Sequence, residues 1–185
     1  IENQAALLQQ RNTACDNMIH WAEQVQSGDA QNHEARAAAY YWANLFAFSG
    51  FKRGREENEP NNLLNYVYAV LRAICARALV SSGLLPVMGI QHKNKYNAYC
   101  LADDIMEAYR PFADELVCSI VDRHDDYEEL TTEIKKELLN IAVVDVYIDG
   151  KKSPLMVAMS RTTNSLYECL SGQNRKLLLP AFVAT

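Results

Sequence analysis

The stretch NNLLNYVYAVLRAICARALVSSG, residues 61–83, carries the clearest fold signal in this chain. Its apolar residues recur at the three- and four-residue spacing of an α-helix over several turns. Asn61 or Asn62 is a suitable N-cap, and Ser81-Ser82-Gly83 is a suitable end, because glycine accepts the left-handed conformation that closes many helices. We therefore expect one long helix between these two signals.

Helical spacing continues on both sides of this stretch. Further helices are expected over residues 3–26, 32–46, 98–110, 112–124, 127–143 and 155–170, with a polar loop over residues 51–62. The segment VVDVYIDGKKSPL alternates around Asp149-Gly150, and an Asp-Gly pair between alternating runs predicts a β-hairpin. The fold class that follows is mainly α, a multi-helix domain with one small β-hairpin near the C-terminus.

The composition fits one globular domain. The chain has 185 residues, of which 49% are hydrophobic and 22% are charged, enough to bury a substantial core. Its apolar runs are broken well short of a membrane span, and no signal-peptide pattern follows Ile1, so we expect no membrane association. Its five cysteines form no C-x-x-C pair, which predicts buried thiols in a reducing compartment, the cytoplasm.

Charge is unevenly distributed along the chain. The net charge is −5, but when Lys and Arg are counted against Asp and Glu, residues 51–102 carry +4, residues 103–149 carry −10 and residues 150–185 carry +4. Local fields rather than the total decide whether a phosphate backbone can dock, so a DNA partner remains open. The acidic stretch 122–137 is expected to be a solvated face.

A histidine precedes three carboxylates in HKNKYNAYCLADDIMEAYRP, residues 92–111. If this segment is helical after its first turn, Asp103, Asp104 and Glu107 lie opposite its apolar face. Such a face is usually solvated, and His92 by itself would be an ordinary surface histidine. This segment alone therefore leaves the function of the four side chains open.

Glu34 raises a second question. In NHEARAAAYYWANLF it shares a helical stripe with apolar residues, namely Ala37, Ala38, Tyr41 and Leu45. Its carboxylate is therefore expected to point toward the interior, where a charge is costly unless it is paired or bound to a metal. Two explanations remain open, an arginine partner such as Arg72 or Arg77, or a cation shared with His92 and Glu107.

Across almost its whole length, the order of these motifs resembles the helical catalytic domain of Cas1, the CRISPR-associated spacer-acquisition integrase. The likeness is carried by SGDAQNHEARAAAYYW, the basic F-K-R loop, the block from Asn61 to Pro111, and the hairpin followed by a helix. It is greatest for the form that accompanies type II CRISPR systems. The resemblance implies a single helical catalytic domain over residues 1–185, without the N-terminal β-rich domain of the family.

The resemblance also implies a set of site residues. In this family a glutamate on an early helix, a histidine after a G-x-x-H turn and an acidic residue on the next helix bind a divalent metal. In this sequence the catalytic and metal-binding residues would be Glu34, His92 and Glu107. Asp103 and Asp104 also lie where related forms carry acidic residues, and Glu107 is preferred because the pattern Leu-Ala-x-Asp-x-Met-Glu ends on it.

The implied reaction inserts a new spacer into a CRISPR array, when a DNA 3′-hydroxyl attacks a repeat phosphodiester. A metal held by two carboxylates and an imidazole would stabilise the charge that develops on the phosphoryl oxygens. Mixed oxygen and nitrogen ligands suit Mn²⁺, whereas Mg²⁺ prefers oxygen ligands and water, so the expected cofactor is Mg²⁺ or Mn²⁺. The implied partners are protospacer and repeat DNA, a second copy in a homodimer, and the second adaptation subunit, Cas2.

Basic residues near these positions acquire a role if the partner is DNA. The candidates for phosphate contacts are Lys52, Arg53, Arg55, Lys93 and Lys95. The aromatic residues at helical spacing are more often core residues and are not assigned to DNA.

Two other classes of protein are weighed against this interpretation. In a non-catalytic helical DNA- or protein-binding module, an arginine would neutralise Glu34 and the acidic face over residues 103–107 would be solvated. A diiron bundle would need a repeated Glu-x-x-His, but His20 and Glu23 occur in the reverse order. The sequence also lacks H-E-x-x-H, P-loop and G-x-S-x-G motifs, which argues against those enzyme classes.

Overall fold

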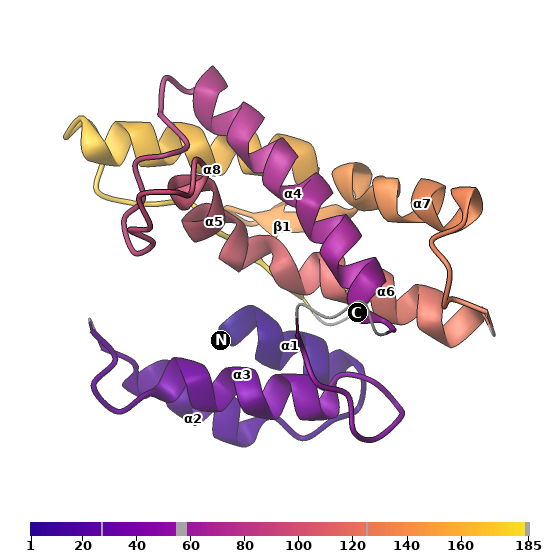
Figure 1. Cartoon of the computed structure of the whole chain (residues 1–185). Helices are drawn as coiled ribbons and strands as arrows, with labels where there is room; N and C mark the ends of the chain where they lie inside the picture. The colour runs from indigo at the N-terminus through magenta and orange to yellow at the C-terminus, as the bar shows by residue number, and fades with distance from the viewer. Residues whose placement is uncertain (27, 55–58, 125, 184–185) are drawn as a thin grey trace. The chain divides into compact units, whose positions relative to one another are not determined.

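The computed structural model describes residues 1–26, 28–54, 59–124 and 126–183. The structure is mainly helical, with a small antiparallel sheet near the C-terminus (Figure 1), which confirms the expected fold class. The chain divides into two compact units, one formed by Ile1–Glu57 with Phe182–Thr185 and the other by Asn58–Ala181. The expectation that residues 1–185 are one catalytic domain stays a prediction.

The first unit contains α1 (Glu2–Gln10), α2 (Asp16–Gln24) and α3 (His33–Asn44). One helix over residues 3–26 was expected, and this is wrong, because the chain breaks between α1 and α2. Asn12 adopts a left-handed conformation at φ 56°, and the amides of Asn12 and Thr13 bond to the carbonyls of Gln9 and Leu8. These two bonds form a Schellman motif, in which asparagine takes the place of the usual glycine.

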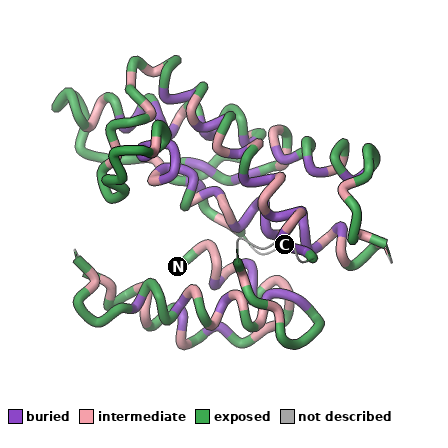
Figure 2. Tube along the Cα trace, in the orientation of Figure 1, coloured by how far each residue is buried: buried purple, intermediate pink, exposed green. Residues whose placement is uncertain are grey.

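The second unit is built around α4 (Asn61–Ser81), which packs against four later helices, α5 (Cys100–Met106), α6 (Arg110–Arg123), α7 (Thr132–Leu139) and α8 (Leu155–Leu170). Buried residues recur along the whole length of α4 (Figure 2), as the helical spacing predicts. The helix ends as expected, because Gly83 has φ 76° and the amide of Leu84 bonds to the carbonyl of Leu79. Its start differs from the prediction, because Pro60 is the N-cap. Asn61 is the first residue of the helix and is buried.

The length and composition of α4 also match those of a membrane span, with a mean hydropathy of 1.5 over its most apolar stretch. Half of this stretch is buried inside the structure. The core helices of compact domains share these properties, so the burial favours a core helix over a membrane span.

Three short helices and a turn of 3-10 helix follow α4. In chain order they are α5 (Cys100–Met106), the 3-10 helix η1 (Glu107–Tyr109), α6 (Arg110–Arg123) and α7 (Thr132–Leu139). A second 3-10 helix, η2 (Asn140–Val143), follows α7. Pro111 was expected to separate two helices, but it lies in the first turn of α6, where a proline has no helical hydrogen bond to break. The helical segments from Cys100 to Arg123 therefore follow one another without a loop.

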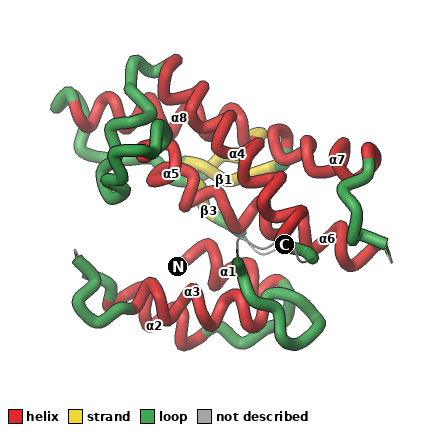
Figure 3. Tube along the Cα trace, viewed as in Figure 1, coloured by secondary structure: helices red, strands yellow, loops and turns green. Residues whose placement is uncertain are grey.

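The predicted hairpin is confirmed as β1 (Asp145–Ile148) and β2 (Lys151–Pro154), which pair in antiparallel register. Asp149 and Gly150 both have positive φ, at 52° and 71°, which is the geometry of a type I′ turn. A third strand, β3 (Pro180–Ala181), pairs with β1 and was not predicted; Figure 3 shows it beside β1. The last helix, α8 (Leu155–Leu170), has the bounds that the sequence predicts.

The expected state of the cysteines is confirmed for four of the five. Cys15, Cys75, Cys100 and Cys118 are buried free thiols, and Cys169 is half-buried. Burial, reinforced by the nearby negative charge of Asp103, raises the pKa of Cys75 to about 12, so this thiol stays protonated and unreactive.

Candidate functional site

The turn that carries His92 is organised by Asp104, which lies on α5. One oxygen of this carboxylate accepts hydrogen bonds from the amides of Ile90 and Gln91, at 2.5 and 3.0 Å. The other accepts from the amide of His92 at 3.0 Å and lies 2.6 Å from the Nδ1 atom of its ring. Burial opposes ionisation of Asp104, but these hydrogen bonds outweigh it and hold the pKa of the carboxyl below its usual range.

This arrangement engages only one of the two ring nitrogens of His92. Nε2 makes no hydrogen bond within the part of the chain that the structure describes, and the side chain is 46% exposed. A histidine that binds a metal commonly donates its other ring N–H to a carboxylate, which fixes the tautomer and the ring orientation. Asp104 can supply this support and keep Nε2 available as a ligand.

Gly89 allows the turn to close over α5. A Cβ atom at this position would overlap the carbonyl oxygen of His92 and would lie 2.6 Å from the Cβ of Cys100. Since Cβ atoms do not approach other heavy atoms so closely, any larger residue would displace the turn. The sequence predicted the G-x-x-H turn but did not reveal that its glycine is required for packing.

Asp103 has a structural role. Both of its oxygens bind Arg72 of α4, at 2.6 and 2.7 Å, and Asn97 donates a further hydrogen bond at 2.7 Å. The residue is only 5% exposed, so the expectation of a solvated face is wrong at this position. The reason is that α5 packs against α4, which brings Asp103 to the guanidinium group of Arg72.

Glu107 is the third carboxylate, in η1. Its side chain is 51% exposed, and one oxygen lies 3.0 Å from Nη2 of Arg110. Partial loss of water around the Glu107 carboxyl raises its pKa. The negative charges of Asp103 and Asp104 reinforce this rise, whereas the charges of Arg110 and His92 oppose it. A partly desolvated carboxylate that is repelled by the charges of other carboxylates is a favourable position for a bound cation.

The structure therefore separates the roles of the three carboxylates. Asp103 is occupied by Arg72 and Asn97, and Asp104 by the turn before α5, whereas Glu107 is paired with Arg110 and has a half-exposed side chain. Across residues 1–26, 28–54, 59–124 and 126–183, no three or more His, Cys, Asp or Glu side chains form a group that could hold a metal ion. The ligand set of Glu34, His92 and Glu107 stays a prediction.

Glu34 lies in the first turn of α3, in the other unit. The carboxylate of Asp29 caps this turn, accepting from the amides of His33 and Glu34 at 2.8 Å each, and these bonds lower the pKa of Asp29. The expectation that Glu34 points inward is wrong, because the side chain is exposed and the buried stripe runs through His33, Ala37 and Tyr41.

The two arginines considered as partners of Glu34 have other contacts. Arg72 binds Asp103, and Nη2 of Arg77 lies 2.9 Å from the sulfur of Met156. The structural explanation for Glu34, a buried carboxylate neutralised by an arginine, therefore loses its basis.

The candidate DNA-contacting residues fall in two loops. In the first unit the ring centres of Phe46 and Phe51 lie 4.7 Å apart. Lys52 and Arg53 directly follow Phe51 in the chain. Arg53 lies over the ring of Trp42, at 5.8 Å. In the second unit Lys93 and Lys95 are exposed directly after His92. Arg55 lies outside the described residues.

The sequence profile of the family described as CRISPR associated protein Cas1 matches residues 1–141. The chain belongs to the Cas1 family. A Cas1 endonuclease of Neisseria meningitidis is 37% identical to it over 158 residues, which are 85% of this chain and 51% of the relative. A Cas1 endonuclease of Pyrobaculum aerophilum is 32% identical over 139 residues, 74% of this chain and 47% of the relative.

The chain thus spans about half the length of the curated Cas1 relatives that it matches. Among solved structures, a casposase bound to integration product superposes with a TM-score of 0.73 and 23% identity, over 95% of this chain and 63% of that chain. At this level of identity the likeness shows a shared fold.

Proposed function

We propose that this Cas1-family chain contributes the catalytic centre of a metal-dependent DNA integrase and endonuclease, which inserts new spacers into a CRISPR array. The observation that carries the proposal is the environment of His92, whose imidazole is fixed by Asp104 with Nε2 left available, near Glu107. The relatives are named as Cas1 endonucleases, which supports a nuclease or integrase over other enzymes. The type II-like subclass stays a prediction.

The residues present suit a divalent cation. His92 and Glu107 offer an imidazole nitrogen and a carboxylate, and Glu34 would supply a second carboxylate. This mixed set suits Mn²⁺ and also admits Mg²⁺. When bound, the cation would polarise a phosphoryl oxygen and neutralise part of the charge in the transition state.

The chain's own residues would then position the reactants. Asp104 would keep the imidazole of His92 in one orientation, and the basic side chains Lys52, Arg53, Arg55, Lys93 and Lys95 would bind phosphates of the DNA. The attacking 3′-hydroxyl forms a new bond to phosphorus, the bond from phosphorus to the leaving 3′-oxygen breaks, and one proton passes between the two oxygens through solvent. No covalent protein intermediate is required.

The expected assembly follows from the family. A homodimer, a second adaptation subunit Cas2 and a cytoplasmic location are all part of the proposal, as are protospacer and repeat DNA as the substrates.

Strand transfer on a branched DNA tests the proposal. The wild-type chain, the Glu107→Ala variant and a chelated sample are compared in Mn²⁺, with Glu133→Ala, an exposed carboxylate on α7, as the matched control. We expect Mn²⁺-dependent product from the wild-type and Glu133→Ala chains and none from the other two samples. Product that persists after complete chelation would contradict the metal-dependent mechanism.

The alternative is a non-catalytic helical binding module, favoured by the lack of a preassembled metal-binding group among the described residues. It predicts that the chain binds DNA equally well with Mn²⁺ and with chelator, and that it yields no strand-transfer product under either condition.

A further inference from the structure

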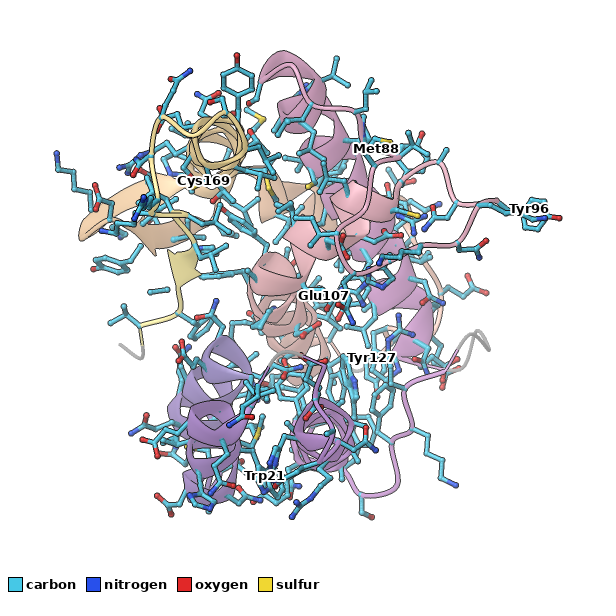
Figure 4. The ribbon with its side chains drawn as sticks, turned by 90° about the vertical axis from the view of Figure 1, so that its left-hand side faces the viewer. Trp21, Met88, Tyr96, Glu107, Tyr127 and Cys169 are labelled. Atoms are coloured by element: carbon cyan, nitrogen blue, oxygen red, sulfur yellow. The ribbon has the colours of Figure 1, made fainter. Side chains whose placement is uncertain are left out.

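The loop between His92 and α5 presents one aromatic ring to solvent. Tyr96 is 84% exposed, more than any other large hydrophobic side chain among the described residues. In Figure 4 it projects from the outer end of its loop, away from the rest of the second unit. An isolated exposed tyrosine would need no explanation, but this one follows directly after a candidate metal ligand and two lysines.

The loop is held in place by hydrogen bonds on both sides of the ring. The amide of Tyr96 donates to the side chain of Asn94 at 3.0 Å, and the amide of Asn97 donates to the carbonyl of Asn94 at 2.9 Å. The thiol of Cys100 donates to the carbonyls of Asn94 and Asn97, at 3.4 Å each, and Asn97 is also bound to Asp103. The outward position of Tyr96 is therefore built into the loop, which lowers the entropic cost of binding a partner there.

The charges around this ring indicate the chemistry of the partner. The ammonium of Lys95 lies 4.8 Å from the centre of the Tyr96 ring, and Lys93 is exposed in the same loop. Protein interfaces are depleted in lysine, whereas proteins that bind single-stranded nucleic acid combine stacking aromatic side chains with cations that follow the backbone. An aromatic ring flanked by lysines thus fits a nucleic acid better than an apolar protein surface.

We propose that Tyr96 stacks on an unpaired base of the DNA substrate, while Lys93 and Lys95 contact the phosphates beside this base. The proposal rests on the proposed function, because it takes DNA as the partner. It assigns the contact with a single-stranded DNA end to Tyr96, since a base inside a duplex offers no free face to the ring.

Fluorescence anisotropy with two labelled DNAs tests this proposal. One is a blunt duplex, and the other is the same duplex with a single-stranded 3′ overhang. Loss of one stacked base corresponds to a decrease of roughly five- to a hundredfold in affinity. We expect Tyr96→Ala to lose that much affinity for the overhang DNA and little for the blunt duplex, and Tyr96→Phe to bind both like the wild type.

Two further variants complete the experiment. Tyr167→Ala removes a ring of α8 that is 45% exposed and serves as the matched control, with no change expected. Lys95→Gln is expected to weaken binding of the overhang DNA more than that of the blunt duplex, and to reduce the salt dependence of overhang binding, as the loss of a phosphate contact would.

Each contrary result has a distinct meaning. If Tyr96→Ala binds the overhang DNA like the wild type, or loses both DNAs equally, the stacking role is wrong while the proposed function stands. If the wild-type chain binds neither DNA, with or without Mn²⁺, the DNA partner and the proposed function are both overturned.

Discussion

At the scale of single residues, Asp104 is the side chain on which the candidate site depends. It accepts hydrogen bonds from three successive amides and from the ring of His92, so its removal would release both the turn and the imidazole. We expect Asp104→Ala to weaken Mn²⁺ binding by about ten- to a hundredfold, the usual effect of removing the carboxylate behind a metal-binding histidine. Isothermal titration with Mn²⁺ measures this directly, without DNA.

The control for this prediction separates positioning from folding. Asp122→Ala removes a carboxylate of α6 outside the His92 turn and should leave Mn²⁺ affinity unchanged. Unchanged Mn²⁺ affinity in Asp104→Ala, with melting temperatures matched between the variants, would show that Asp104 does not support a ligand.

The sequence predicted the segment of the candidate site but not the different contacts that its carboxylates make. Asp103 and Asp104 are adjacent and chemically identical, and their roles differ because of partners that are distant in the sequence: Arg72 for one and residues 90–92 for the other. No local spacing rule could separate them. Glu34 was misplaced for a related reason, because one residue of rotation at the start of α3 buries His33 in its place.

At the scale of elements, the packing of α6 against α7 includes a charged cluster with a definite pH dependence. Glu137 binds Arg123 at 2.7 Å and His124 at 2.9 Å. Burial opposes its ionisation, but these two partners outweigh it and hold the pKa of Glu137 below its usual range. A carboxyl with a lowered pKa stabilises the fold above its unfolded-state pKa, and this stabilisation is lost as the pH falls through the folded-state pKa.

We therefore expect Glu137→Gln to lower the free energy of unfolding by roughly 0.5–1 kcal/mol at pH 7, because the cluster is partly exposed to solvent. The difference from the wild type should shrink below pH 4.5 and vanish once Glu137 is protonated in the folded chain. Thermal unfolding followed by circular dichroism across pH 3–8 measures both trends. A difference that stays constant over this range would rule out the charged contacts as its source.

The elements were predictable where a local signal marks each end. Gly83 ends α4, and Asp149-Gly150 sets the hairpin turn, as the sequence predicts. The break between α1 and α2 was missed because Asn12, a less specific signal than glycine, closes the first helix. The strand β3 was missed because two residues carry no periodicity, and its pairing with β1 depends on a contact more than thirty residues away along the chain.

At the scale of the whole molecule, the division into two units bears directly on the proposed site. Glu34 belongs to the unit that contains α3, whereas His92 and Glu107 belong to the unit built on α4. The sequence offered this grouping as one of two explanations for Glu34, and the resemblance to Cas1 then favoured it, but nothing in the spacing of these residues specifies that they meet. The ligand set is therefore best tested by its effect on metal affinity, with no assumption about geometry.

We expect Glu34→Ala and Glu107→Ala to weaken Mn²⁺ binding to a similar extent, each by at least tenfold, because each removes one of two charged oxygen ligands. The double variant should be little worse than either single variant, since residues that act on one ion are not additive. Isothermal titration of the four chains measures this, with Glu133→Ala as the control. If Glu107→Ala loses Mn²⁺ while Glu34→Ala binds it like the wild type, the cation is held by the α4 unit alone, and a ligand other than Glu34 completes its coordination.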